Sequence, residues 1–156
     1  MTGDAVGSNE RWLVVLVDDD DTFLSDYGRG LQLFSVAHSR REVEIATFND
    51  AREAMEFAGK KTGRRWLWIL DSMMPFRADF SAAETRSGLL TGVSMLKRLR
   101  EIQTTERAVR FVILTNYAKE EVEAALGDAG IDGVVSKLHC TPRQLAAKVD
   151  GIIMGR

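Results

Sequence analysis

Five side chains that suit phosphate or metal chemistry each follow a short apolar run of the sequence. Asp18 and Asp19 come after the first run, and Asp71, Thr115 and Lys137 follow three later ones. Aspartates are ionised at neutral pH, and two carboxylates about 4 Å apart repel each other by roughly 4 kcal/mol at an effective dielectric constant of about 20. If folding brings these residues together, their charge calls for a cation. Carboxylate oxygens with open positions beside them suit Mg²⁺ completed by water and phosphate oxygens.

The apolar runs that precede these residues are typical of β-strands. Trp12–Val17 and Trp66–Leu70 are continuously apolar, which favours strands buried on both faces. Arg110–Leu114 is similar, and Gly133–Ser136 is a short strand. Val43–Phe48 mixes polar and apolar residues, as an edge strand does.

Apolar residues at helical spacing follow each predicted strand. The inward-facing residues of the five predicted helices are, in chain order, Phe23, Tyr27, Leu31 and Phe34; Ala51, Ala54, Met55 and Ala58; Val93, Leu96, Leu99 and Ile102; Val122, Ala125, Leu126 and Ala129; and Leu145, Val149, Ile152 and Ile153. Asp21 or Thr22 is the expected cap of the first helix. Asn49 or Asp50 is expected to cap the second. Gly130 is expected to end the fourth. Thr141 is expected to cap the last helix, with Pro142 at its first position.

This alternation of five strands and five helices predicts an α/β fold with a parallel sheet covered on both faces. Ligands of such sheets bind at the carboxyl ends of the strands, near the switch in strand order. Asp18, Asp19, Asp71, Thr115 and Lys137 all lie at predicted strand ends. We therefore expect them to converge on one edge of the sheet.

The motifs at these strand ends resemble those of the receiver domain of two-component response regulators. They are Val17-Asp18-Asp19, Leu70-Asp71 followed by Met73-Met74-Pro75, Leu114-Thr115, and Ser136-Lys137. The resemblance extends over residues 12–154. It implies a doubly wound (βα)5 flavodoxin-like fold with strand order 2-1-3-4-5.

The resemblance also implies a metal site. Asp19 and Asp71 would ligate Mg²⁺ directly, Asp18 would act through a water, and Met73 would contribute its backbone carbonyl. Carboxylate and carbonyl oxygens are ligands that suit this ion.

The resemblance further implies a phosphorylation-dependent signalling switch that catalyses only its own phosphorylation and dephosphorylation. Asp71 would accept a phosphoryl group from a sensor histidine kinase or a histidine phosphotransfer protein. Lys137 would pair with the phosphoryl oxygens, and the Thr115 hydroxyl would hydrogen-bond them. The surface of the fourth predicted helix and the fifth strand would then change for a downstream protein partner. The sequence leaves a homodimer open.

Several positions differ from the usual pattern of that family. Leu138 follows the lysine where a proline in a cis bond is usual, and Val134 replaces an aromatic residue. Asn116 is larger than the residue usual after the threonine. Tyr117 and Met73 would flank the phosphate, and we expect these groups to shield it from water.

The stretch before Thr115 is longer than in that family, and the extra length lies at 76–91. Structureless loops beyond about 12–15 residues are uncommon and often functional. Ser81 and Glu84 have the spacing of a capping box, which predicts a short helical turn ending near Gly88. We expect this insertion to be a lid or a partner-contact loop.

Two other functions remain open from the sequence. Asp18-x-Asp20-x-Thr22 also resembles the first motif of haloacid-dehalogenase-type phosphatases, in which Asp18 would be the nucleophile. The acidic motif of that family has counterparts only in Asp128 and Asp132, which precede the lysine instead of following it. A degenerate receiver that serves as a protein-binding module is the other alternative.

Composition agrees with one globular domain. The chain has 156 residues, of which 45% are hydrophobic and 28% charged, which excludes wholesale disorder. Its 21 basic and 23 acidic residues give a net charge of −2, so nucleic-acid binding is not expected. The single Cys140 excludes an internal disulfide. No apolar run approaches the roughly 20 residues that span a membrane. Residues 1–10 have the composition of a flexible leader without a secretory signal, so we expect a cytoplasmic domain over 11–156.

Overall fold

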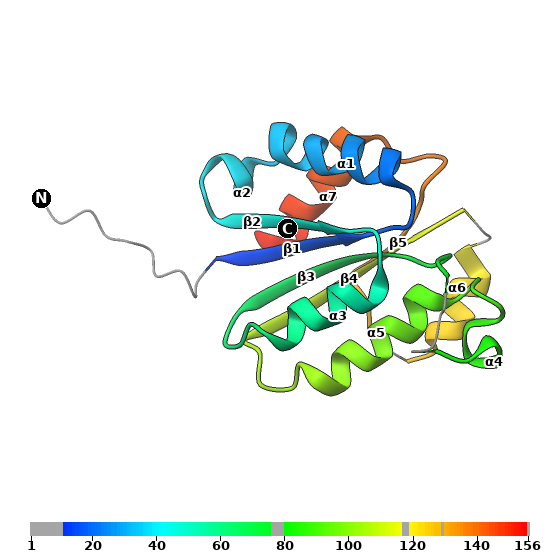
Figure 1. Ribbon diagram of the computed structural model, residues 1–156. Helices are drawn as coiled ribbons and strands as arrows, with labels where there is room; N and C mark the ends of the chain where they lie inside the picture. Colours follow the sequence, from blue (N-terminus) through cyan, green and yellow to red (C-terminus); the bar gives the residue numbers. More distant parts are fainter. Residues whose placement is uncertain (1–10, 76–79, 117–118, 129, 156) are drawn as a thin grey trace, which may run out of the picture.

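In a computed structural model, the chain forms a five-stranded parallel sheet between two layers of helices (Figure 1). The structure describes residues 11–75, 80–116, 119–128 and 130–155. The strands are β1 (Trp12–Val17), β2 (Val43–Phe48), β3 (Arg65–Asp71), β4 (Ala108–Thr115) and β5 (Gly133–Ser136). Their order is β2-β1-β3-β4-β5, which confirms the predicted fold class and strand order.

The two most apolar strands lie inside the sheet, and the more polar β2 lies at one edge. Every residue of β1 is buried, because β1 is flanked by β2 and β3 and covered by helices on both faces. The register pairs Val17 with Leu70, and Leu70 with Ile113. The carboxyl ends of β1, β3 and β4 are therefore level with one another.

The described residues form seven helices. They are α1 (Asp21–Phe34), α2 (Val36–Ser39), α3 (Ala51–Gly59), α4 (Ala82–Thr85), α5 (Thr91–Ile102), α6 (Lys119–Leu126) and α7 (Pro142–Ile153). Five of them are the predicted helices. α4 is the turn expected from the capping box of Ser81 and Glu84, both halves of which form, whereas α2 was not predicted. None of these helices is long and apolar enough to cross a membrane.

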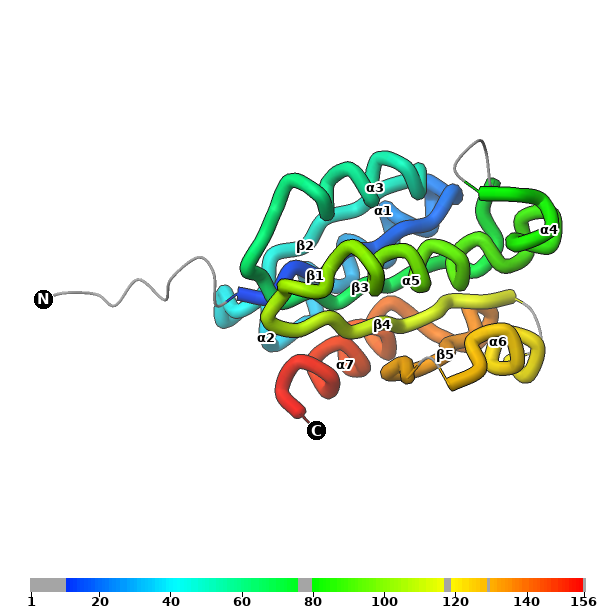
Figure 2. The backbone as a smooth tube through the Cα atoms, turned by 90° about the horizontal axis from the view of Figure 1, so that it is seen from below, coloured from blue at the N-terminus to red at the C-terminus, as the bar shows by residue number. Residues whose placement is uncertain are grey.

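The sheet divides the hydrophobic core into two halves, and helices cover each half. α1 and α7 cover one face of the sheet, and α3, α5 and α6 lie side by side over the other (Figures 1 and 2). Trp66 and Trp68 are fully buried on the second face, where their rings stack with centroids 5.2 Å apart. Their indole N–H groups donate to Glu106 and Gln103 at 2.9 Å. These pairs satisfy the polar atoms of two large core residues.

The first helix departs from the prediction at both ends. Asp20, rather than Asp21 or Thr22, is its cap, because the Asp20 carboxylate accepts hydrogen bonds from the backbone N–H groups of Thr22 and Phe23. At the other end Phe34 is 40% exposed instead of facing the core.

The fourth predicted helix is shorter than expected. α6 ends at Leu126 because Gly127 adopts a left-handed conformation with φ of 56°, so the helix does not continue to Gly130. Ala129, expected on its inner face, lies outside the described residues.

Candidate functional site

The carboxyl edge of the sheet gathers most of the residues singled out in the sequence. Asp18 follows β1, Asp71 ends β3, Thr115 ends β4 and Lys137 follows β5. The backbone N–H of Lys137 donates to the carbonyl of Thr115 at 2.9 Å, which continues the β4–β5 pairing up to the lysine.

Three carboxylates lie together at this edge. One oxygen from each of Asp18, Asp19 and Asp71 lies within 4.8 Å of the other two. Asp18 is fully buried and Asp71 is only 3% exposed, whereas Asp19 is exposed. The cluster is thus open to solvent on the Asp19 side.

Lys137 joins this cluster through its ammonium group. Its Nζ lies 2.6 Å from Oδ2 of Asp18 and 3.4 Å from Oδ2 of Asp71. Burial alone lowers the pKa of Lys137, but the hydrogen bond to Asp18 and the charge of Asp71 outweigh burial and raise it. Lys137 therefore remains a cation, and it reaches both buried aspartates although Leu138 follows it.

The two buried aspartates are less acidic than ordinary carboxyls. Burial, followed by the charge of Asp18, raises the pKa of Asp71 to about 7, although Lys137 opposes this shift. Burial also raises the pKa of Asp18. One ammonium group thus does not balance three carboxylates at this edge.

This arrangement fits a divalent cation. One oxygen from each of three carboxylates lies within 4.8 Å of the others, and the charge of an ion bound there would oppose both the burial and the repulsion from Asp18 that raise the pKa of Asp71. Local hydrogen bonds orient the two buried side chains. The N–H of Asp20 donates to Asp18 at 2.9 Å, and the N–H of Met73 donates to Asp71 at 3.3 Å.

The other predicted site residues differ in their placement. Thr115 is buried at the end of β4, Asn116 beside it is exposed, and Met73 is 39% exposed. Tyr117 lies outside the described residues. Val134 lies on β5, partly buried, away from the carboxylates.

Gly92 is a site residue that the sequence analysis missed. A Cβ atom at this position would lie 2.1 Å from the carbonyl oxygen of Asp71. The backbone N–H of Gly92 also donates to the carbonyl of Ser72 at 3.1 Å. The first turn of α5 therefore abuts the backbone of Asp71 so closely that only glycine fits. A glycine directly before the first apolar residue of a predicted helix was the available signal.

The insertion is tied to the end of β3 by its described part. The hydroxyl of Thr91 donates to the carbonyl of Met74 at 2.6 Å, and the N–H of Met74 donates to the carbonyl of Gly88 at 3.2 Å. An open groove of about 480 Å³ lies between the insertion and the carboxylates. It is lined by Asp19, Met73, Met74, Pro75, Ser87, Gly88 and Leu89. Residues 76–79 of the insertion lie outside the described residues.

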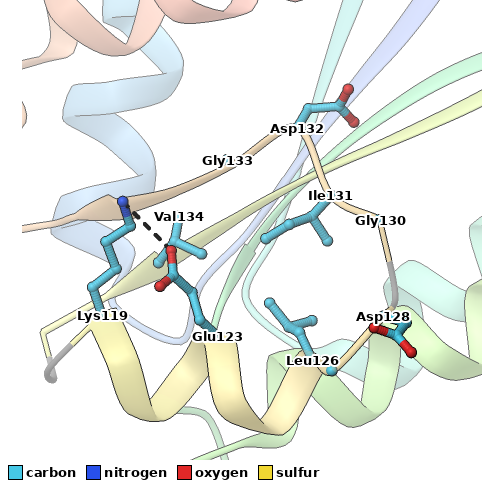
Figure 3. A pocket seen from close by; sticks show the side chains of 10 residues that line it. Lys119, Glu123, Leu126, Asp128, Gly130, Ile131, Asp132, Gly133 and Val134 are labelled. Carbon is cyan, nitrogen blue, oxygen red and sulfur yellow. Dashed lines mark ion pairs between the residues drawn. The ribbon is translucent and has the colours of Figure 1, made fainter.

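A second hollow lies away from the carboxylates, between α6 and the start of β5. It has a volume of about 440 Å³. Leu126, Ile131 and Val134 line it, and an ion pair of 3.5 Å between Lys119 and Glu123 spans one turn of α6 at its rim (Figure 3).

The acidic residues that resemble a phosphatase motif do not join the cluster. Asp132 precedes β5, so it lies at the opposite end of that strand from Lys137. Its carboxylate accepts a hydrogen bond of 3.0 Å from the N–H of Phe111 and pairs with Arg110 at 4.0 Å.

Comparison with solved structures identifies the fold. A CheY-like receiver domain protein from Methanospirillum hungatei matches with a TM-score of 0.66 and 18% identity over 93% of this chain and 95% of that one. The isolated receiver domain of RcsB from Salmonella enterica serovar Typhimurium, in the presence of phosphomimetic BeF3⁻, matches with a TM-score of 0.67 and 18% identity. This match covers 94% of this chain and 91% of that one. The fold is that of response regulator receiver domains.

Another similar structure belongs to a longer protein. Response regulator DrrB of Thermotoga maritima, an OmpR/PhoB homologue, matches this receiver fold with a TM-score of 0.64 and 21% identity over 93% of this chain. The match spans 54% of the DrrB chain, so this chain covers about half of that response regulator. No protein-family model matches the sequence, and no curated protein is significantly similar to it.

Proposed function

We propose that this protein is a phosphorylation-dependent signalling switch in which Asp71 is the phosphoacceptor. The observation that carries the proposal is the joint position of Asp18, Asp19, Asp71 and Lys137 at the carboxyl edge of a receiver fold. This role makes the protein a signalling domain whose chemistry is confined to its own phosphorylation and dephosphorylation.

The phosphoryl donor is the phosphohistidine of a sensor kinase or of a phosphotransfer protein. An oxygen of Asp71 forms the new bond to phosphorus as the bond from phosphorus to the histidine nitrogen breaks, and that nitrogen keeps the electron pair. Lys137, held by Asp18 at 2.6 Å, faces the phosphoryl oxygens with its positive charge. The Thr115 hydroxyl donates a hydrogen bond to the attached phosphoryl group. Positioning and charge neutralisation account for most of such catalysis.

Mg²⁺ is the cation that this chemistry requires. Asp19 and Asp71 would ligate it directly, Asp18 through a water, and Met73 through its carbonyl. When bound, the ion supplies positive charge against the phosphoryl oxygens.

The output surface that we propose consists of α6 and β5. Only residues 116–118 separate Thr115 from the start of α6, so movement of Thr115 toward the phosphoryl group would displace that helix. The hollow lined by Leu126, Ile131 and Val134 would change shape with α6, which offers a partner protein a surface that depends on phosphorylation (Figure 3).

The insertion and the residues after Thr115 modulate the site in this proposal. Residues 76–91 form a lid or a partner contact, and their groove beside Asp19 supports this role. Asn116, Tyr117 and Met73 shield the phosphoryl group from water. A shorter lifetime of the phosphorylated protein in Tyr117→Ala is expected, and an unchanged lifetime would contradict the shielding.

Phosphorylation by a small donor tests the main proposal. The protein is incubated with Mg²⁺ and acetyl phosphate, the acyl phosphate is trapped with borohydride, and the modified residue is located by mass spectrometry. We expect modification of Asp71, its loss in Asp71→Asn, and retention in the control variant Asp26→Asn on the exposed face of α1.

The same experiment distinguishes the alternatives. Modification of Asp18 with rapid multiple turnover would instead support the phosphatase. A folded protein that takes up no phosphoryl group would support a degenerate receiver that acts as a binding module.

A further inference from the structure

One face of α1 contacts the chain segment that carries Lys137. Phe23, Tyr27 and Gly30 are spaced i, i+4 and i+7, so they lie on one side of this helix. We refer to these three residues as the α1 stripe. They contact successive positions of the segment 137–142 in the same order.

The first residue of the stripe lies against the lysine itself. Nζ of Lys137 is 4.4 Å from the centroid of the Phe23 ring, within the range of a cation–π interaction. The Phe23 ring stacks on Tyr27 with centroids 3.9 Å apart and an angle of 14° between the planes. The ring that contacts the ammonium group is therefore itself held in place.

The other two residues hold the rest of the segment. The hydroxyl of Tyr27 donates to the backbone carbonyl of Cys140. A Cβ atom at Gly30 would lie 2.4 Å from Cβ of Pro142, so α1 and the start of α7 approach as closely as a glycine permits. The segment is thus contacted by α1 from the lysine to the first turn of α7.

Other contacts hold the two ends of this segment, and at the far end Thr141 and Gln144 form the capping box of α7. The N–H of Lys137 donates to Thr115 at 2.9 Å, and the N–H of His139 donates to Ser136 at 3.2 Å. Leu138 is 72% exposed, so its side chain does little to anchor the segment. Between the lysine and the cap of α7, the α1 stripe contacts the segment at Cys140 through Tyr27.

We propose that the α1 stripe positions Lys137 for phosphoryl transfer, with Phe23 as the positioning residue beneath the ammonium group. The proposal rests on the proposed function, in which Lys137 faces the phosphoryl oxygens. Without the ring the ammonium group keeps its ion pair with Asp18 but loses a support that fixes its approach to Asp71, 3.4 Å away. Phosphorylation therefore slows, whereas Mg²⁺ affinity stays, because the ring supports the ammonium group and not the carboxylates.

The first test compares variants of Phe23 with a matched control. Phe34→Leu also removes a half-exposed α1 ring that lies under a cation, in that case Arg143 at 4.5 Å, but at the far end of the helix. With acetyl phosphate and Mg²⁺, Phe23→Leu is expected to be phosphorylated about fivefold more slowly than the wild type. Phe23→Tyr restores the rate, Phe34→Leu leaves it unchanged, and Mg²⁺ affinity measured by calorimetry is the same in all variants.

The second test does not depend on phosphorylation. Competitive acetylation of lysines, read by mass spectrometry against the exposed Lys60, reports how freely the Lys137 amine reacts. Phe23→Leu is expected to raise the relative reactivity of Lys137 severalfold, and Phe34→Leu is expected to leave it unchanged.

Any of three results would overturn the proposal. Phe23→Leu could be phosphorylated at the wild-type rate, Phe34→Leu could slow phosphorylation as much as Phe23→Leu does, or the reactivity of Lys137 could be unchanged in Phe23→Leu. A wild-type protein that takes up no phosphoryl group would overturn the proposed function instead, and the acetylation experiment would still decide whether the stripe holds the lysine.

Discussion

Asp71 lies where burial and the neighbouring charge of Asp18 both disfavour its ionised form. Its pKa of about 7 in the folded protein lies well above the ordinary value near 4 that it regains on unfolding. Between these two values the folded protein binds more protons than the unfolded chain. The metal-free protein therefore loses stability as the pH rises through this range.

This titration leads to a prediction for Asp71→Asn. In buffer with EDTA, the free energy of unfolding of the wild type should fall as the pH rises from about 4 to about 7. The variant should show a smaller slope and should be more stable than the wild type by on the order of 2 kcal/mol at about pH 8, because it buries no carboxylate at this position. Urea denaturation at a series of pH values measures both. A slope as steep as that of the wild type would contradict the prediction.

A second residue-scale prediction concerns Gly92. Gly92→Ala places a methyl group 2.1 Å from the carbonyl oxygen of Asp71, so α5 or the end of β3 must shift. We expect a loss of about 1–3 kcal/mol in the free energy of unfolding, as for other overpacked sites, together with slower phosphorylation by acetyl phosphate.

The control for this variant is Gly59→Ala in α3. A Cβ atom at Gly59 meets nothing within 4 Å, so that substitution should leave both stability and phosphorylation nearly unchanged. Equal effects of the two substitutions would show that the close approach to Asp71 is unimportant.

Among the elements, α2 is stabilised mainly by a residue far away in sequence. The carboxylate of Asp150, on α7, accepts hydrogen bonds from the Ser35 hydroxyl at 2.6 Å and from the N–H groups of Val36 and Ala37 at 2.8 and 3.1 Å. A negative charge at the first N–H groups of a helix satisfies donors that otherwise lack partners. Asp150 thus links the junction between α1 and α2 to α7.

Substitution of Asp150 should therefore destabilise the fold without affecting the site. We expect Asp150→Ala to lower the free energy of unfolding by about 2 kcal/mol, because three donors, two of them part-buried, lose their acceptor. The rate of phosphorylation by acetyl phosphate, measured below the unfolding transition, should not change. Asp26→Ala serves as the control, because it removes the same charge from an exposed position. A slower phosphorylation rate in Asp150→Ala would mean that α2 and the site are coupled.

The elements also show which parts of the structure can be predicted from sequence. The bounds of β1 and the cap at Thr141 followed from local patterns, an unbroken apolar run and a hydroxyl before proline. α2 is a single turn with only a local serine cap, Ser35, which accepts from the N–H of His38 at 3.1 Å, and its other acceptor comes from α7. The spacing of Phe23, Tyr27 and their successors predicted a helix, but it could not tell which aromatic ring would lie under a lysine.

The candidate site was predictable to a similar extent. Aspartates and a lysine at strand ends must meet once the sheet is parallel, so Asp18, Asp71 and Lys137 were expected together and are found together. Gly92 was missed because its role depends on the distance between α5 and β3, and adjacent residues do not encode that distance. The roles of these residues remain predictions until phosphorylation is measured.

At the scale of the whole molecule, the carboxylate cluster links segments that are distant in sequence. Asp18 and Asp19 follow β1, and Asp71 ends β3, so an ion bound to them joins two central strands. The unfolded chain does not hold these groups together. Ion binding should therefore favour the folded state.

The resulting prediction is a thermal shift with Mg²⁺. Addition of roughly 10 mM MgCl₂ should raise the melting temperature by a few degrees, since ligand at about tenfold its dissociation constant stabilises by about 1.4 kcal/mol. Asp19→Asn should reduce the shift, because it removes one ligand charge. NaCl at matched ionic strength is the control, and an equal shift with NaCl would mean that the ion only screens charge.

The stacked indoles of Trp66 and Trp68 lie on the same strand as Asp71, the proposed phosphoacceptor, which Trp68 precedes by three residues. Excited states of rings so close and so nearly parallel couple to one another, and the coupling is sensitive to small changes in their geometry. The near-ultraviolet circular dichroism and the emission spectrum of the unlabelled chain should therefore register any rearrangement of β3. The molecule contains its own optical probe of events at Asp71.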